Sequence, residues 1–173
     1  MISPEKDQAF FEEGLRELEP YLLSNELYWP SRVRTADFTQ LTLGALLLVG
    51  TRLKGTGLAA ELVAVRSKWR SAWETKARRE VHARSELWKD FLGEARSSPN
   101  ESARRYPSEV RHRAILELLI EGLPERSDAA VDALDETLRA FWLPGDFVWD
   151  AALEPVFPKK SFWFLYGTLT KEK

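Results

Sequence analysis

The sequence predicts an all-α protein, a single-domain bundle of about five helices over residues 1–173. Apolar residues recur at spacings of three and four along most of the chain, as on the buried face of a helix. Residues that favour helix starts and stops flank these stretches. No stretch shows the sustained apolar and polar alternation of a half-buried strand. A length of 173 residues suits one domain, because domains commonly hold about 100–200 residues.

The first helix is expected to begin at Ser3, a favourable N-cap, with Pro4 at the first helical position. Pro20 is expected to kink or divide this helix near Glu19, because proline removes a backbone hydrogen bond. The loop that follows, Tyr28-Trp29-Pro30-Ser31, contains two large rings. The helix carries one apolar face, formed by Phe10, Phe11, Leu15, Leu18 and Leu22.

The second helix is predicted from Thr35, its N-cap candidate, to about Lys54. Its middle, residues 41–49, is apolar on nearly every side, which indicates a helix surrounded by protein at the centre of the core. Gly44 and Gly50 each cost about 1 kcal/mol in a helix interior relative to alanine. We therefore expect them to allow a close approach of another helix.

After a break at residues 55–57, one long central helix is predicted over 58–96. It would be nearly 60 Å long, against a radius of gyration of about 16 Å for a compact chain of this size, so it either protrudes or breaks. The apolar stripe thins over residues 74–86, which predicts a bend or a solvent-spanning section. A protruding stripe would offer a seam for a homodimer. The stripe comprises Leu58, Leu62, Val65, Trp69, Trp73 and Ala77, then Val81, Trp88, Phe91, Leu92 and Ala95.

The remaining helices are shorter. A loop is predicted at residues 97–100, and the next helix is expected to open at Pro107 and to stop at Gly122. The last helix is expected to be capped at Ser127 or Asp128 and to end before the Pro144-Gly145 pair.

Residues 143–173 are expected to form an irregular strap rich in aromatic residues and proline. Nine of the twenty aromatic residues lie in the last fifth of the chain, and the interleaved prolines forbid a continuous helix. Such a segment either completes a core or forms an exposed binding surface. We favour the strap, because several short helices leave a core that Phe157, Phe162 and Phe164 would seal.

Charge is distributed unevenly along a chain whose net charge is only −2. Residues 1–30 are acidic, residues 31–113 hold seventeen Lys and Arg against nine Asp and Glu, and residues 114–156 are acidic again. Acidic helices would neutralise the basic one if they pack beside it. The alternative is a basic face kept open for an anionic partner.

No constellation in the sequence points to a catalytic or metal site. Cysteine is absent, which excludes disulfides and thiolate ligands. Glu109 and His112 have the i, i+3 spacing of di-iron carboxylate bundles, but such a site needs a second copy, and His82 is preceded three residues earlier by Arg79. Phosphate-binding loops, nucleophile elbows and dinucleotide fingerprints are missing. We therefore expect no cofactor and no metal, and we favour a protein that is not an enzyme.

A basic, tryptophan-containing helix face over residues 66–84 resembles the charged and aromatic surfaces of single-strand nucleic-acid binders. Trp69 and Trp73 continue the apolar stripe, so they are expected to point into the core, which weakens this interpretation. Arg111 and Arg113 would either clamp an anion or bridge to the acidic last helix, and bridging is favoured. The candidate partner or ligand surface comprises Arg66, Lys68, Arg70, Arg78, Arg79, Arg111, Arg113, Trp149 and Trp163.

The expected function is that of a non-catalytic protein-interaction or scaffold module in the cytoplasm, with a protein partner or a second copy of the chain. The alternatives are a nucleic-acid-binding protein using the 66–84 face and, after that, an enzyme of unknown class. No membrane association is expected, because the apolar stretch 41–49 is shorter than the roughly 18 residues needed to cross a bilayer. The first residues lack the pattern of a secretory signal.

Overall fold

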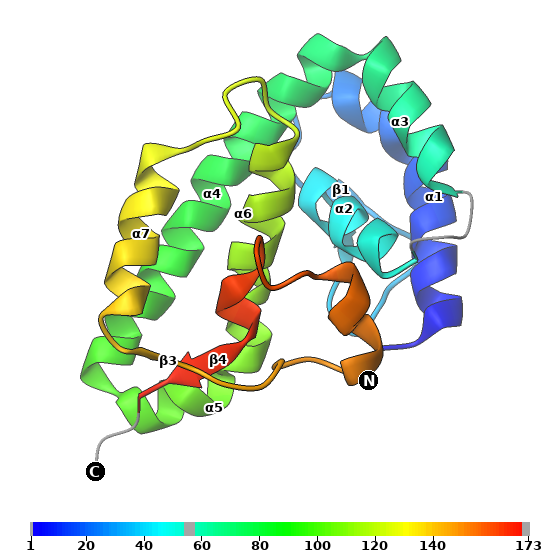
Figure 1. Cartoon of the computed structure of the whole chain (residues 1–173). Helices are drawn as coiled ribbons and strands as arrows, with labels where there is room; N and C mark the ends of the chain where they lie inside the picture. Colours follow the sequence, from blue (N-terminus) through cyan, green and yellow to red (C-terminus); the bar gives the residue numbers. More distant parts are fainter. Residues whose placement is uncertain (1, 54–57, 171–173) are drawn as a thin grey trace. The chain divides into compact units, whose positions relative to one another are not determined.

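The computed structural model describes residues 2–53 and 58–170 and is predominantly helical, as predicted, with two short antiparallel sheets (Figure 1). The chain divides into two compact units, Met1–Glu80 and Val81–Lys173, and each is described by itself. The boundary falls inside one helix; whether the chain forms one domain stays a prediction. The elements are α1 (Pro4–Leu23), β1 (Trp29–Pro30), β2 (Gln40–Leu41), α2 (Leu43–Arg52), α3 (Leu58–Lys68), α4 (Arg70–Ser97), α5 (Pro99–Glu109), α6 (Arg111–Glu121), α7 (Ala129–Arg139), β3 (Trp142–Pro144), η1 (Ala151–Val156), η2 (Trp163–Leu165) and β4 (Gly167–Leu169).

Helix α1 begins as predicted and packs on α2. The Ser3 side chain accepts a hydrogen bond from the backbone of Lys6, and Pro4 opens the helix. Pro20 does not divide it, since the helix continues to Leu23 and Pro20 lies only in its last turn. Gly50 allows a close approach, as expected: a Cβ there would lie 2.6 Å from the Phe11 ring.

The helix predicted from Thr35 begins later, at Leu43. Thr35 does cap a turn, because its hydroxyl oxygen accepts hydrogen bonds from the backbones of Asp37 and Phe38, but the chain then extends into β2, which pairs with β1. Thr42 is the N-cap of α2. The apolar middle of this helix is buried, as predicted, apart from the half-buried Leu47. The predicted end at Lys54 and the break at residues 55–57 lie outside the described residues.

The long helix predicted over residues 58–96 breaks, and it breaks at Trp69 between α3 and α4. Helix α4 runs through residues 74–86 without interruption, and Lys76, Glu80 and Arg84 are buried there, so the predicted solvent-spanning section is wrong, while the alternative of a bend stays a prediction. The stripe is buried within this one chain apart from the half-buried Val65 and Trp69 and from Leu58, whose side chain is not described. The stripe therefore does not form the protruding seam expected for a homodimer, and the homodimer itself stays a prediction.

Helices α5 and α6 replace the single helix expected from Pro107. Pro99 opens α5, Pro107 lies inside it, and the predicted loop at residues 97–100 shrinks to Ser98. Helix α6 ends at Gly122, as predicted. Asp128 caps α7 by accepting from the backbone of Val131.

The C-terminal segment is a strap that completes the core of the second unit, as predicted. Phe157, Phe162 and Phe164 are buried. The Tyr106 hydroxyl of α5 donates to the Phe164 carbonyl at 2.7 Å. The segment also contains strands, because Trp142–Pro144 pairs with Gly167–Leu169 (Figure 1). Strands of two or three residues are too short to show an alternating pattern, so they are not predictable from periodicity.

Candidate functional site

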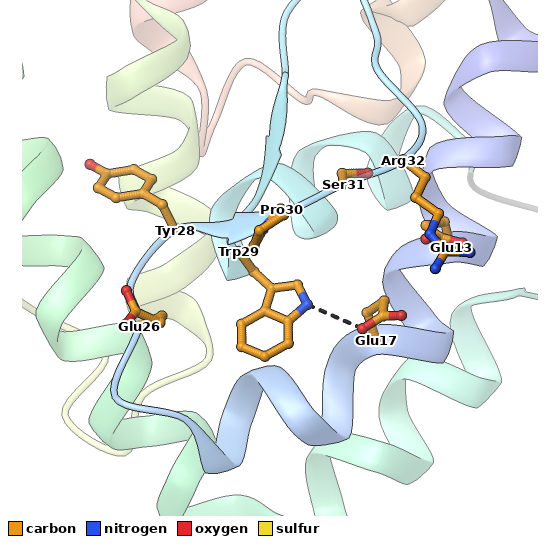
Figure 2. Close-up of a pocket in the computed structure, with 8 residues that line it drawn as sticks. All are labelled: Glu13, Glu17, Glu26, Tyr28, Trp29, Pro30, Ser31 and Arg32. Carbon is orange, nitrogen blue, oxygen red and sulfur yellow. Dashed lines mark hydrogen bonds between the residues drawn. The ribbon is translucent and has the colours of Figure 1, made fainter.

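The first unit contains an open pocket of about 560 Å³ at its surface (Figure 2). Helix α1 contributes one wall, and the chain from the turn after α1 through β1 contributes the other. The lining combines two aromatic rings with three carboxylates. It comprises Glu13, Glu17, Glu26, Tyr28, Trp29, Pro30, Ser31 and Arg32.

Trp29 is the fixed ring of this pocket. Strand pairing with Leu41 holds its backbone, and its indole N–H donates to the Glu17 carboxylate of α1 at 3.1 Å. The ring also packs against Tyr21, with centroids 6.0 Å apart. Tyr28 precedes it in the chain, and its side chain is 46% exposed. The Trp29 ring is therefore held in place, while the neighbouring Tyr28 is exposed to solvent.

The carboxylates leave an excess of negative charge. Glu13 pairs with Arg16 at 3.0 Å, and Figure 2 shows Arg32 on the Glu13 side of the pocket. Glu17 uses one oxygen to hold the Trp29 indole, and Glu26 is exposed. Among the lining residues the excess charge therefore belongs to Glu17 and in part to Glu26, whose charge also acts on the buried Lys76.

Two basic residues of α4 hold the turn that enters the pocket. The buried Lys76 ammonium donates to the carbonyl oxygens of Ser24 and Glu26 and lies 4.4 Å from the centre of the Tyr21 ring. Burial lowers the pKa of Lys76, with a smaller contribution from the charge of Arg79. Arg79 donates to the Asn25 carbonyl at 2.8 Å. A predicted site residue, Arg79, thus supports the pocket from outside its lining.

The other residues of the predicted basic face lie on the helices α3 and α4. Lys68, Arg70 and Arg78 are exposed, while Arg66 is half-buried with its guanidinium 5.3 Å from the Trp73 ring centre. Lys68 lies over the Trp69 ring at 5.4 Å. Trp73 is buried, as predicted, and Trp69 is half-buried.

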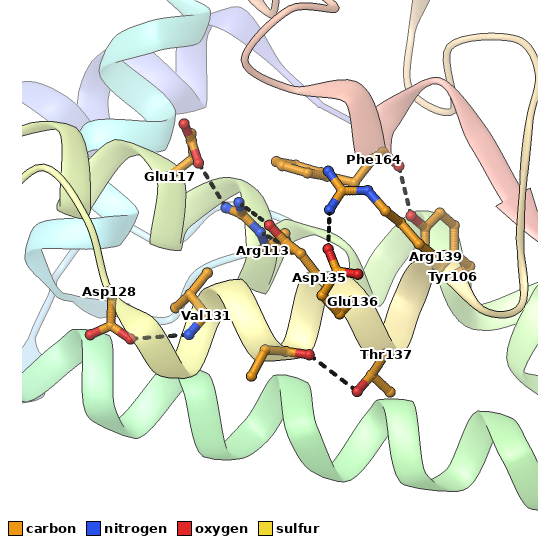
Figure 3. Close-up of polar contacts among 11 residues, drawn as sticks. Tyr106, Arg113, Glu117, Asp128, Val131, Asp135, Glu136, Thr137, Arg139 and Phe164 are labelled. Carbon is orange, nitrogen blue, oxygen red and sulfur yellow. Dashed lines mark hydrogen bonds and ion pairs between the residues drawn. The ribbon is translucent and has the colours of Figure 1, made fainter.

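Arg113 does not belong to a surface, because it is 5% exposed and bridges to the last helix (Figure 3). Its guanidinium donates to both Asp135 oxygens, at 2.7 and 2.9 Å, and to Glu117 at 2.9 Å. Burial lowers the pKa of Arg113, but its bonds to Asp135 and Glu117 outweigh that effect and raise it. The predicted bridge to the acidic last helix is confirmed for Arg113. Arg111 is half-buried.

The two predicted tryptophans of the tail are half-buried and engaged in packing. The Trp149 indole N–H donates to the Pro107 carbonyl at 2.7 Å, and its ring meets Phe157 edge-on. Trp163 meets Trp142 edge-on, and the Arg139 guanidinium lies 4.3 Å from its ring centre.

The Glu109 and His112 pair is not arranged as a metal site. Glu109 accepts from Arg105 at 2.9 Å, while the His112 Nδ1 atom lies 3.2 Å from the Arg84 guanidinium. Burial, then the charges of Arg84 and Arg111, lower the pKa of His112 to about 3. Over residues 2–53 and 58–170, no three potential ligand side chains gather in a metal-binding cluster.

A second pocket of about 680 Å³ lies in the second unit, between α4 and α7. Its charges are balanced, because Lys89 and Arg96 lie beside Asp90 and Glu94, and Leu134 and Thr137 come from α7. It contains no aromatic ring, so it offers no chemical preference of the kind found in the first pocket.

The two rings of the 28–31 loop and the acidic first segment are visible in the sequence, but the pocket that they form together was not predicted. One feature of the sequence could have indicated it: Glu13 and Glu17 are four residues apart and therefore share one face of the helix. Comparison of the chain with protein-family models, curated proteins and solved structures finds no match. None of the helices in the described part of the chain has the length and apolarity needed to cross a bilayer.

Proposed function

We propose that this protein is a non-catalytic protein-interaction module whose binding site is the pocket around Tyr28 and Trp29. The observation that carries the proposal is an exposed tyrosine beside a tryptophan fixed in an open pocket. Tyrosine and tryptophan are enriched among the residues that dominate binding energy in protein interfaces.

The openness of the pocket favours a protein over a small metabolite. Small-molecule sites bury about 70–90% of their ligand. Four lining residues, Glu26, Tyr28, Pro30 and Arg32, are exposed, so a metabolite would remain largely in solvent. A side chain that protrudes from a partner needs only such an open recess, because the surrounding surfaces supply the remaining contact area.

The buried ionisable groups support a non-catalytic assignment, because they are used to hold the fold. Glu80 accepts the backbone N–H of Gly44 at 3.0 Å, at the start of α2. Arg52 pairs with Asp37 at 2.6 Å at the end of the same helix. Lys76 holds the turn after α1. None of these groups lines either pocket.

The proposal is tested by photo-crosslinking in the cells that make the protein. A benzophenone amino acid replaces Tyr28 or, as a control, the exposed Leu143 of the second unit. We expect a discrete protein adduct from position 28 that is absent from position 143 and that Trp29→Ala abolishes. An absence of adducts from position 28, or the same adducts from both positions, would contradict the proposal.

Nucleic-acid binding is the second candidate, favoured by one observation: Lys68, Arg70 and Arg78 are exposed near the junction of α3 and α4. The burial of Trp73 removes one ring that bases would need for stacking. A binder of this kind would lose affinity for single-stranded DNA steeply as salt rises. Titration at several salt concentrations, with Arg70→Gln and Arg78→Gln, tests this candidate.

A further inference from the structure

We infer that the Tyr28–Trp29 pocket accepts the side chain of an arginine or lysine from a basic segment of a protein partner. This inference rests on the proposed function and specifies its ligand. The ligand is defined by two properties of the lining, its excess of carboxylates over cations and its aromatic surface, which together select a cation.

The charge of the lining is the first argument. Three carboxylates face the pocket and one cation, Arg32, lines it. Glu13 has Arg16 beside it at 3.0 Å, and the charge of Glu26 acts on the nearby Lys76, so the carboxylate least compensated by a cation is Glu17. In Figure 2 the Trp29 indole lies between the Glu17 and Glu26 side chains. A cation placed against the indole would therefore have the Glu17 carboxylate beside it and would share the pocket with Glu26.

The aromatic surface is the second argument. Because the Trp29 N–H is already bonded to Glu17, the ring has no further polar group that could bond to a ligand. A ligand can therefore contact Trp29 only through the apolar surface of its ring. A cation over the face of tryptophan or tyrosine is attracted by the partial negative charge of the ring face. The chain uses this contact elsewhere, with Lys76 over Tyr21 at 4.4 Å and Arg139 over Trp163 at 4.3 Å.

The same lining disfavours other ligands. A phosphorylated or acidic segment would meet Glu17 and Glu26, and like charges brought together repel. A purely apolar side chain would strip water from these carboxylates without replacing its hydrogen bonds, which is unfavourable. A guanidinium or ammonium group supplies donors to both carboxylates, and such charge-assisted bonds are among the stronger ones in proteins.

The Trp29 indole N–H provides a direct readout, because it touches Glu17. Its resonance in a proton–nitrogen spectrum is assigned by its loss in Trp29→Phe. The probes are a blocked Gly-Gly-Arg-Gly-Gly peptide and its lysine counterpart. Their matched neutral controls carry citrulline in place of arginine and acetyl-lysine in place of lysine, which keep nearly the same shape without the charge.

The variant that tests the charge is the double substitution Glu17→Gln and Glu26→Gln. Glutamine keeps an oxygen that can accept the Trp29 N–H, so the ring stays in place while the charge is lost. Glu19→Gln is the matched control, because Glu19 is an exposed glutamate of α1 that does not line the pocket. Thermal melting establishes that the variants are folded.

We expect the arginine and lysine peptides to shift the Trp29 resonance saturably and the neutral peptides to leave it unchanged. The double variant should bind at least about tenfold more weakly, since it loses the charge-assisted hydrogen bonds to the ligand, and Glu19→Gln should bind as the wild type does. Equal binding of the citrulline and arginine peptides, full affinity in the double variant, or no shift at millimolar peptide would overturn the inference. If any of these results is found together with the adduct from position 28, the basic ligand is contradicted but the proposed interaction module is not. Specific peptide binding without an adduct instead contradicts the proposed function alone.

Discussion

At the scale of single residues, the buried pair of Arg113 and Asp135 joins α6 to α7 through two hydrogen bonds. Asp135 is 6% exposed, so truncating it leaves a guanidinium that is mostly buried and keeps the Glu117 carboxylate as its remaining ion pair among the described residues. Breaking a buried pair on one side costs about 3–5 kcal/mol. We expect Asp135→Ala to lower the free energy of unfolding, measured in urea, by about this amount.

The control for this prediction removes both charges. Replacing a buried pair with apolar residues of similar volume is often neutral or stabilising. The double variant Arg113→Met and Asp135→Leu should therefore be more stable than Asp135→Ala alone. Equal losses in the single and double variants would show that packing, and not the uncompensated charge, causes the effect.

His112 gives the fold a pH dependence whose sign follows from its environment. Burial and the charges of Arg84 and Arg111 hold its folded-state pKa at about 3, below the ordinary value of 6.5. The unfolded state therefore binds a proton that the folded state does not between these two values, and stability falls as pH decreases from about 6.5 to about 3. We expect His112→Gln to make the urea midpoint less sensitive to pH in that window.

The quantity to compare is the difference in urea midpoint between the wild type and His112→Gln at each pH, because carboxylates titrate in the same pH range and affect both proteins. His82, which is exposed on α4, supplies the matched substitution. His82→Gln should leave the pH profile close to that of the wild type. Parallel profiles for wild type and His112→Gln would mean that His112 is protonated in the folded protein.

At the scale of elements, α4 shows why the position of the helix break was not predictable. Lys76, Glu80 and Arg84 follow one another at four-residue spacing and are all buried. The sequence suggests a solvent-spanning section there, since these residues are most often exposed. Their partners, Ser24, Gly44 and His112, lie 28–52 residues away in the chain. The sequence pattern shows which residues are polar. Whether a polar residue is buried depends on partners such as these, which lie far away in the chain.

The start of α2 shows a different limit of prediction from sequence. Threonine was correctly expected to act as a cap, but the residue at which the helix begins was not predicted. Thr35 and Thr42 both accept bonds from backbone groups three residues ahead. Only Thr42 begins a helix, because residues 40 and 41 pair with β1 and because Glu80 satisfies the Gly44 N–H. A cap residue is visible in the sequence, but the competition between strand and helix is decided by partners elsewhere in the fold.

The sheet of β3 and β4 requires glycine at position 167. A Cβ there would collide with the Leu143 carbonyl oxygen and the Trp142 ring. Overpacking of this kind typically costs about 1–3 kcal/mol, so Gly167→Ala should lower the free energy of unfolding by that amount. Gly93, an exposed glycine within α4, is the matched control because an added Cβ meets nothing within 4 Å. Gly93→Ala should raise stability by up to about 1 kcal/mol, and equal effects at the two sites would refute the collision.

At the scale of the whole molecule, the sequence predicted the helical class and the burial of the aromatic strap but not the candidate site. The class follows from helical periodicity, which is a local property of the chain. The pocket requires α1 and β1 to be placed together, and that placement depends on the Trp29 bond to Glu17, twelve residues away. The uneven charge along the chain is partly neutralised inside the fold, as Arg113 and Asp135 show.

The C-terminal strap provides the last prediction, because it supplies much of the second unit's core. Phe164 is fully buried, its carbonyl accepts the Tyr106 hydroxyl, and Arg113 lies 4.5 Å from the centre of its ring. Phe164→Ala should cost about 3–5 kcal/mol, the usual range for a buried phenylalanine, whereas Leu143→Ala, at a side chain that is 54% exposed, should change stability little. Chain termination after Trp142 removes β4 and every buried ring of the strap, so hydrogen exchange should show that the amides of α5 and α6 lose protection. A truncated protein that kept those amides protected and melted cooperatively would mean that the helices pack without the strap, and the buried rings would then be a covering and not part of the core.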